Sequence, residues 1–396
     1  MRLIRRGALS LLLIALIAAI VWGPSYFRGL SLVVRAADLD GWLKTVAASG
    51  ASAYRTDAPA TIETRHGAVP MRVYRPAGRV TRTTLLTPGV HAMGIDEPRL
   101  KGLAADLAES GIAVVTIALP DLMRYRFTPE AVDQIEDAAA WIAARPDLAP
   151  DGKIGLMGIS FAGGLSVVAA GRPSIRDKAA YVFSFGGHGD LQRVLRYLCT
   201  GLEPRAPGTP PATPPHFRAP HDYGVAVILI GIADRVVPAG QVDALRRGLE
   251  TFLTASQLTL VDMELAKKTF TESQAIAASL PEPSKTLMEY VNARNTKALG
   301  ARLLPVLDRI GDQEYPPALS AEHSPSPAAP VYLLHGADDT VIPAVETQLL
   351  ARHLESQGTT VHALLSGLIT HAEVDRSAAA RETWALVGFW AKLLQE

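Results

Sequence analysis

The sequence contains almost no cysteine, and this shortage excludes two kinds of site. Cys199 is the single cysteine of the chain, so no internal disulfide can form. No cysteine–histidine spacing typical of a zinc site occurs in the sequence either. We therefore predict that Cys199 is a small buried hydrophobic residue, and the sequence implies neither a metal nor an organic cofactor.

The chain also lacks an excess of charge of either sign, which argues against a polyanionic partner. Lysine and arginine together number 39, aspartate and glutamate also number 39, and the formal net charge is zero. No concentrated basic stripe is present, so nucleic-acid binding is not expected. The chain has 396 residues, of which 48% are hydrophobic. This is enough for a sizeable core, and for two domains or one large domain with an insertion.

Residues 1–27 have the pattern of a membrane-targeting segment. Three arginines within the first six residues precede an uncharged run, 7–27, which has about the 20 residues that a helix needs to cross a bilayer. The positive-inside rule then predicts a cytoplasmic N-terminus and an extracytoplasmic catalytic domain, tethered to membrane lipid by a single-pass anchor. The alternative is a cleaved signal peptide and a secreted protein, although Pro24 would obstruct cleavage just before it.

From residue 60 the sequence predicts an α/β fold. Short apolar runs alternate with segments whose apolar residues recur at helical spacing. The run 112–118 is apolar except for Thr116, as expected for a strand that is buried on both faces. This alternation predicts a mostly parallel sheet with helices on both faces.

The alternation stops at residue 190 and resumes near residue 330. Residues 204–220 hold seven prolines, which cannot build an ordinary helix or a central strand. Helix-spaced apolar residues follow them. We therefore expect a connecting segment at 28–59, a core formed by 60–189 and 330–396, and a mainly helical cap inserted at 190–329.

The stretch 152–172 has the pattern of a nucleophile elbow, the tight strand-to-helix turn that presents a catalytic serine. A short apolar run ends in GISFAGG, whose third residue is Ser160, and a small-residue segment that favours helix follows. The residues two positions to either side of the serine must be tiny, and they are Gly158 and Ala162. The simpler interpretation is a glycine-rich turn with an incidental serine.

A serine nucleophile needs a base and an acid that orients the base. Asp339 lies in HGADDTVIP, directly after an apolar run. A carboxylate just beyond the C-terminal end of a parallel strand faces the top of the sheet, where the elbow also lies. His371, in SGLITHAE after the last apolar run, is the predicted base.

Backbone amides are expected to form an oxyanion hole. One amide should belong to Phe161, which directly follows the serine, and the other to the loop that begins at Pro88-Gly89. Val90 is the preferred donor in that loop, and His91 is the alternative.

The three motifs GISFAGG, HGADDTVIP and GLITH resemble the α/β-hydrolase superfamily, and within it the dienelactone-hydrolase and prolyl-oligopeptidase-like esterases. The resemblance covers the predicted core, with the insertion where that superfamily places its cap. It implies that Ser160 is the nucleophile, Asp339 the acid and His371 the base. The sequence departs from the family pattern in Ala162, where glycine is usual, and in Pro-Gly at 88–89, where many members have His-Gly.

Two other aspartates are alternative acids. Asp234 lies in VAVILIGIADRVVPAG, which echoes the segment around Asp339 and could be the acid-bearing strand end. Asp339 is preferred because its interval to the predicted base leaves room for one helix and one strand. Asp190 follows another apolar run and is the third candidate. His188 and His91 are expected at a pocket rim or in a loop, and the remaining histidines at the surface.

These patterns predict a serine hydrolase that cleaves small-molecule carboxylic esters through an acyl-enzyme intermediate. A peptidase or amidase of the prolyl-oligopeptidase-like type is the runner-up. The sequence is also compatible with a catalytically silent binding module of the same fold, and with a scaffold in which the insertion is the working part. It does not indicate the oligomeric state.

Overall fold

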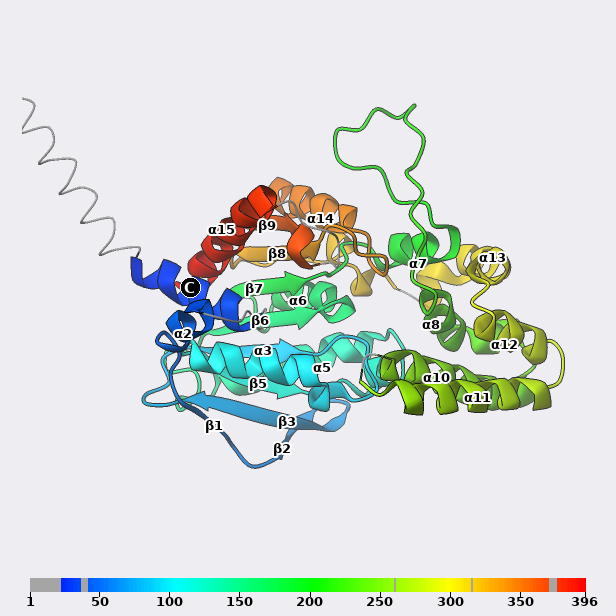
Figure 1. Cartoon of the computed structure of the whole chain (residues 1–396), viewed down its shortest axis with the longest axis horizontal. Helices are drawn as coiled ribbons and strands as arrows, with labels where there is room; N and C mark the ends of the chain where they lie inside the picture. Colours follow the sequence, from blue (N-terminus) through cyan, green and yellow to red (C-terminus); the bar gives the residue numbers. More distant parts are fainter. Residues whose placement is uncertain (1–22, 37–41, 260, 315, 370–375) are drawn as a thin grey trace, which may run out of the picture.

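The computed structural model describes the whole chain except residues 1–22, 37–41, 260, 315 and 370–375 (Figure 1). Within the described residues, nine strands form a single sheet. They are β1 (Tyr54–Thr56), β2 (Ala60–Thr64), β3 (Gly67–Pro76), β4 (Thr83–Thr87), β5 (Ala113–Ile117), β6 (Ile154–Ile159), β7 (Ala179–Phe185), β8 (Val331–Gly336) and β9 (Val361–Ser366).

The sheet is parallel over most of its width. Its order is β1-β3-β5-β4-β6-β7-β8-β9, with β2 paired to β3 outside this path. The neighbours from β5 to β9 pair in parallel, whereas β3 is antiparallel to β1, β2 and β5. Strands β4 and β5 are buried along their whole length. The sequence of β5 is apolar except for Thr116, and the three threonines of β4 donate hydrogen bonds to backbone carbonyls. The predicted fold class, an α/β fold with a mostly parallel sheet, is confirmed.

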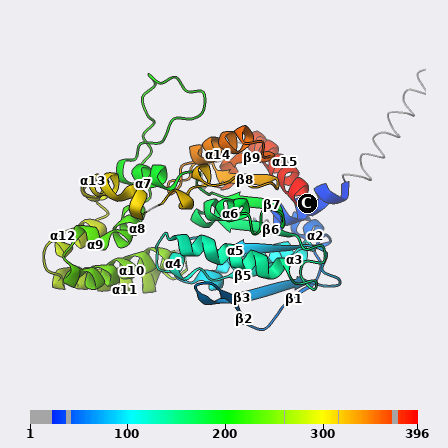
Figure 2. The ribbon, with the colours of Figure 1, turned by 180° about the vertical axis from the view of Figure 1, so that it is seen from behind.

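Helices cover both faces of the sheet (Figures 1 and 2). On one face, apolar residues of α5 (Pro129–Ala143), α6 (Phe161–Gly171) and α14 (Val345–Ser356) pack into the larger core cluster. On the other face, α3 (Pro98–Glu109) and α15 (Arg376–Leu393) pack into the smaller one.

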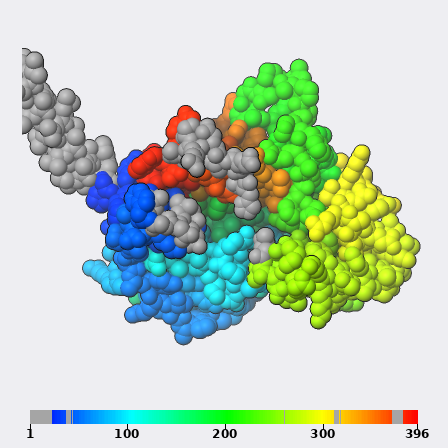
Figure 3. All heavy atoms as spheres, in the orientation of Figure 1, coloured from blue at the N-terminus to red at the C-terminus, as the bar shows by residue number. Residues whose placement is uncertain are grey.

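The chain between β7 and β8 is helical and lies at one end of the sheet, at the right of Figure 1 and in green to yellow in Figure 3. Residues 202–220, which include the seven prolines, extend from it as a loop (Figure 1). The helices are α7 (Leu191–Thr200), α8 (Gly224–Gly231), α9 (Ala233–Val236), α10 (Val242–Leu258), α11 (Met263–Ser279), α12 (Ser284–Asn292) and α13 (Thr296–Glu314).

The N-terminal prediction requires correction. Most of the predicted anchor, residues 1–22, lies outside the described residues, and among the described helices none combines the length and the apolar character needed to cross a bilayer. This finding contradicts the predicted single-pass localisation. The helical residues 23–36 pack on the core instead. Leu32 is fully buried against α3 and α15, and Arg35 forms ion pairs with Asp106 and Glu109 of α3.

Candidate active site

Ser160 occupies a strained turn between β6 and α6. Its backbone has φ 56° and ψ −133°, a conformation that costs a residue with a side chain about 1–3 kcal/mol. A Cβ atom at Gly158 would lie 2.2 Å from the carbonyl oxygen of Ala162, so only glycine fits at that position. Likewise a Cβ atom at Gly163 would lie 2.5 Å from Ser184 Oγ on β7. The small residues around the serine therefore allow α6 to pack closely against the strands.

The loop after β4 passes directly beside the serine. A Cβ atom at Gly89 would lie 3.2 Å from both Ser160 Cβ and the Ile159 carbonyl oxygen, which is tighter than ordinary contact. Val90 and His91 follow at the wall of a cavity. The His91 Nδ1 atom accepts a hydrogen bond from the Met93 amide at 3.2 Å, and burial lowers the pKa of His91.

Phe161 is the first residue of α6 and is buried. The first amides of a helix have no partner within the helix, so the Phe161 N–H can serve a group that lies above Ser160. Its ring packs against Phe127, with 4.4 Å between the ring centroids. This packing fixes the start of the helix relative to the core.

Asp339 lies beyond the end of β8, as the sequence predicts. Its Oδ1 atom accepts hydrogen bonds from the Val341 and Ile342 amides at 2.8 and 3.1 Å, which closes the turn around it. Its Oδ2 atom lies 3.4 Å from His335 Nε2, and 3.5 Å from the position of a Cβ atom at Gly186.

Gly186 lies between Asp339 and the turn that carries Ser160. It follows β7, and its φ of +62° suits glycine. The neighbouring residue, Phe185, accepts a hydrogen bond from the Ser160 amide at 2.6 Å, and the Gly186 amide donates to Leu334 of β8 at 2.8 Å. The structure therefore places Ser160 and Asp339 at the ends of β6 and β8, the two strands on either side of β7, at one edge of the sheet.

The predicted base, His371, lies outside the described residues. The described chain before it consists of β9, which pairs with β8, and a short turn at Gly367–Ile369. The assignment of His371 therefore stays a prediction from the sequence.

The alternative acids lie in other surroundings. Asp190 caps α7, where its side chain accepts from the Arg193 amide at 3.2 Å and also faces His323. Asp234 lies on the short helix α9, 46% exposed, next to Arg235 and Arg246. The apolar run before Asp234, which resembles a strand in sequence, forms α8. Neither carboxylate stands at the end of a strand beside Asp339.

Two histidines are more buried than the sequence indicates. His188, expected at a pocket rim, is fully buried against the Phe161 ring, and its Nε2–H donates to the Leu319 carbonyl at 2.9 Å. Burial lowers the pKa of His188 to about 4. His335, expected at the surface, is fully buried in β8 and donates from Nε2 to Ile342. Its place in the apolar run VYLLHG was the signal that could have predicted this.

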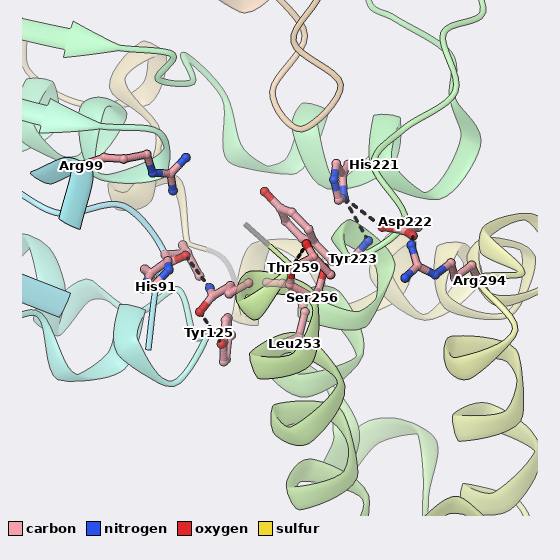
Figure 4. A pocket seen from close by; sticks show the side chains of 13 residues that line it. His91, Arg99, Tyr125, His221, Asp222, Tyr223, Leu253, Ser256, Thr259 and Arg294 are labelled. Carbon is pink, nitrogen blue, oxygen red and sulfur yellow. Dashed lines mark hydrogen bonds and ion pairs between the residues drawn. The ribbon is translucent and has the colours of Figure 1, made fainter. Parts of the chain in front are cut away.

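A cavity of about 500 Å³ lies between the loop after β4 and the helical insertion between β7 and β8, which is the predicted cap (Figure 4). Val90 and His91 line it from the core, and Tyr223 and Leu253 line it from the cap. The start of α8 is joined to the turn that carries Asp339, because the His221 amide donates to the Thr340 carbonyl at 2.8 Å. Sequence reasoning did not identify the cap residues of this wall, because no local motif marks them.

One carboxylate of the cavity is paired. Asp222 forms an ion pair with Arg294 and a hydrogen bond with His221, and these contacts lower the pKa of Asp222, with the His221 hydrogen bond as the main cause (Figure 4). Burial raises the pKa of Tyr125 to about 12. Within the part of the chain that the structure describes, no group of three or more His, Cys, Asp or Glu side chains is arranged to hold a metal ion.

No protein-family model and no curated protein sequence matches the chain. Among solved structures, an esterase from Pyrobaculum calidifontis aligns over 95% of this chain and 94% of its own, with 16% identity and a TM-score of 0.43. The carboxylesterase EstE1, cloned from a metagenomic library, aligns over 92% and 94%, with 15% identity and a TM-score of 0.44. An acylaminoacyl peptidase from Pyrococcus horikoshii aligns over 90% of this chain and 43% of its own, with 11% identity and a TM-score of 0.45. Similarity at this level carries no argument about activity.

Proposed function

We propose that the protein is a serine hydrolase that cleaves carboxylic esters through an acyl-enzyme intermediate. The observation that carries this proposal is the strained conformation of Ser160, with the Gly89 loop in contact on one side and Asp339 across Gly186 on the other. A strained serine is costly to maintain, and strain of this kind clusters at active sites. The proposed subfamily is the dienelactone-hydrolase and prolyl-oligopeptidase-like branch that the sequence motifs resemble.

In the proposed reaction, Ser160 Oγ attacks the ester carbonyl carbon while His371 takes its proton. The Phe161 and Val90 amides donate hydrogen bonds to the oxyanion. His371 then gives the proton to the leaving alcohol, and the acyl group stays on Ser160. A water molecule deprotonated by His371 attacks this acyl-enzyme, and the tetrahedral intermediate collapses to the carboxylic acid and free serine. Asp339 orients the imidazole and stabilises its charged form.

The insertion between β7 and β8 is proposed to act as the cap of this site. The cavity that it closes is lined from the core by Val90, one of the two proposed oxyanion donors. A cavity of about 500 Å³ falls within the range of small-molecule sites. The cap is therefore proposed to limit which esters reach Ser160.

The test is covalent labelling of the full-length protein with a fluorophosphonate probe. We expect labelling of the wild type, none of Ser160→Ala, and strongly reduced labelling of His371→Ala. Ser356→Ala, which removes an exposed serine on α14, is the control and should label as the wild type does. A wild-type protein that is folded but unlabelled would refute the enzyme assignment, and labelling that survives Ser160→Ala would refute the site. Matched aryl esters and anilides would then separate an esterase from an amidase.

A further inference from the structure

A second, smaller hollow continues the cavity toward the surface. Its volume is about 230 Å³, and His91, Arg99 and Gln257 line both hollows, so the two are adjacent. The smaller one is a groove between the end of α10 and the chain that leads into α3. We call it the α10 groove.

The walls of the α10 groove are mainly apolar, in contrast to the larger cavity. The core side supplies Ala92, Met93 and Pro98, and the cap side supplies Leu258 and Val261. The Met93 and Val261 side chains are 45% and 69% exposed, so both present apolar surface to solvent. Apolar surface that lines a concave site, unlike scattered single residues, is suited to bind an apolar group.

The dimensions of the α10 groove suit a single chain. A volume of about 230 Å³ is below that of a pocket for a drug-sized molecule. The groove also leads inward, because it shares His91 with the cavity that Val90 lines. Val90 directly follows Gly89, which lies against Ser160, so a flexible apolar chain in the groove can belong to a molecule whose ester group reaches the serine. Binding of a protein partner or a lipid surface would not require the groove to connect with the cavity.

We propose that the α10 groove binds the apolar chain of the ester substrate and makes longer-chain esters better substrates. This inference rests on the proposed esterase function, and it adds the substrate class and the residues that select it. Met93 and Val261 are the specificity-determining residues, since they supply exposed apolar wall on opposite sides of the groove.

The experiment compares 4-nitrophenyl esters from acetate to decanoate, each below its solubility limit, and a second series in which the alkyl chain is on the alcohol side. We expect kcat/KM of the full-length protein to rise about two- to fourfold per added methylene until the groove is filled, in one of the two series. The series that rises identifies whether the acyl or the alcohol chain occupies the groove.

Met93→Ser, Val261→Ser and the double variant should remove most of this rise, measured as the ratio of kcat/KM for the decanoate ester to kcat/KM for the acetate ester. Trp42→Ser, which removes an exposed aromatic ring on α2 (Trp42–Ala48), is the control and should keep the full rise. Equal slopes in the wild type and the double variant, or activity that appears only above the solubility limit of the ester, would overturn the inference. If the wild type cleaves no ester and Ser160 takes no probe, the proposed function itself has failed.

Discussion

Ser160 and Asp339 are positioned by backbone rather than by side-chain packing. The serine takes its conformation from the elbow, and the Asp339 turn is closed by two backbone amides that donate to Oδ1. Gly186 lies between them and leaves the space that the Oδ2 atom faces. Because each turn is local and follows a strand end, the positions of both residues can be predicted from sequence motifs alone.

Replacing Asp339 with asparagine should separate its proposed catalytic role from its structural one. The asparagine Oδ1 atom can still accept from the Val341 and Ile342 amides, so the turn and the thermal midpoint should change little. The negative charge that stabilises a protonated base is lost, and kcat should fall by up to about 10⁴-fold, as for other triad acids. Hydrolysis of a short aryl ester measures this loss. Asp234→Asn is the matched control, and a similar loss in that variant would move the acid to Asp234.

Other residues of the site could not be predicted from local sequence motifs. Tyr223 and Gln257 reach the cavity only because the cap helices pack over the core. This packing leaves no pattern of residue spacing in the sequence from which it could be predicted. The position of His371 after the last strand predicts its role, which the structure leaves untested. The surface expectation for His335 is wrong because a single polar residue at the end of an apolar run need not be exposed, and β8 is buried on both faces.

At the scale of elements, α10 holds the loop that carries the proposed oxyanion donor. The Gln257 side chain accepts from the Ala92 amide at 3.4 Å and donates to the Val90 carbonyl at 3.5 Å, so it spans the peptide groups on both sides of His91. The Tyr125 hydroxyl donates to the same Gln257 oxygen at 3.2 Å. One side chain of α10 therefore holds the two peptide groups that follow the Gly89–Val90 peptide, whose N–H is proposed to face the oxyanion.

Removing this contact should impair the chemical step more than substrate binding. We expect Gln257→Ala to lower kcat about tenfold, with KM changed less than threefold, because a misplaced donor stabilises only the transition state less. Gln257→Glu keeps an acceptor for the Ala92 amide but places a carboxylate against the Val90 carbonyl, and it should be impaired as well. Steady-state kinetics on a short ester measure both. A kcat equal to that of the wild type in Gln257→Ala would show that the loop holds its position without the cap.

The elements were predicted with unequal success, for a physical reason. Strands such as β5 are short, rich in β-branched residues and followed by glycine or a loop, and their positions were predicted correctly from the sequence. The run VAVILIGI has the same composition but forms α8, because a short apolar run has no periodicity that distinguishes a buried strand from a buried helix. The neighbouring elements determine whether such a run forms a strand or a helix. The helix α8 is buried among α7, α10 and α13 rather than beside a strand.

At the scale of the whole molecule, a cluster of ion pairs around the buried Glu346 stabilises the packing of the cap against the core. Arg193 of α7 forms ion pairs with Glu346 of α14 at 2.5 Å and with Glu322 at 2.6 Å. Glu346 is fully buried, and burial raises its pKa although Arg193 opposes the shift. Breaking one partner of such a cluster leaves an uncompensated buried charge, so the cluster resists separation of cap and core.

His188 lies at the same junction, between α6 and the chain at Leu319, and it should make stability depend on pH. Burial lowers its pKa from the ordinary 6.5 to about 4, so the folded protein binds fewer protons than the unfolded chain between these values. The contribution of His188 to the free energy of unfolding is therefore fully present above pH 6.5. It decreases as the pH falls toward 4, by up to about 3 kcal/mol.

The thermal midpoint measured at about pH 7 and about pH 4.5, on either side of the ordinary histidine pKa, tests this contribution. We expect the midpoint of the wild type to fall by several degrees more than that of His188→Gln, because glutamine can donate to the Leu319 carbonyl but does not titrate. His353→Gln, on the outer part of α14, should behave as the wild type does. If His188→Gln loses as much stability on acidification as the wild type, the buried imidazole does not govern the pH dependence, and the acidic side chains of the junction become the cause to examine.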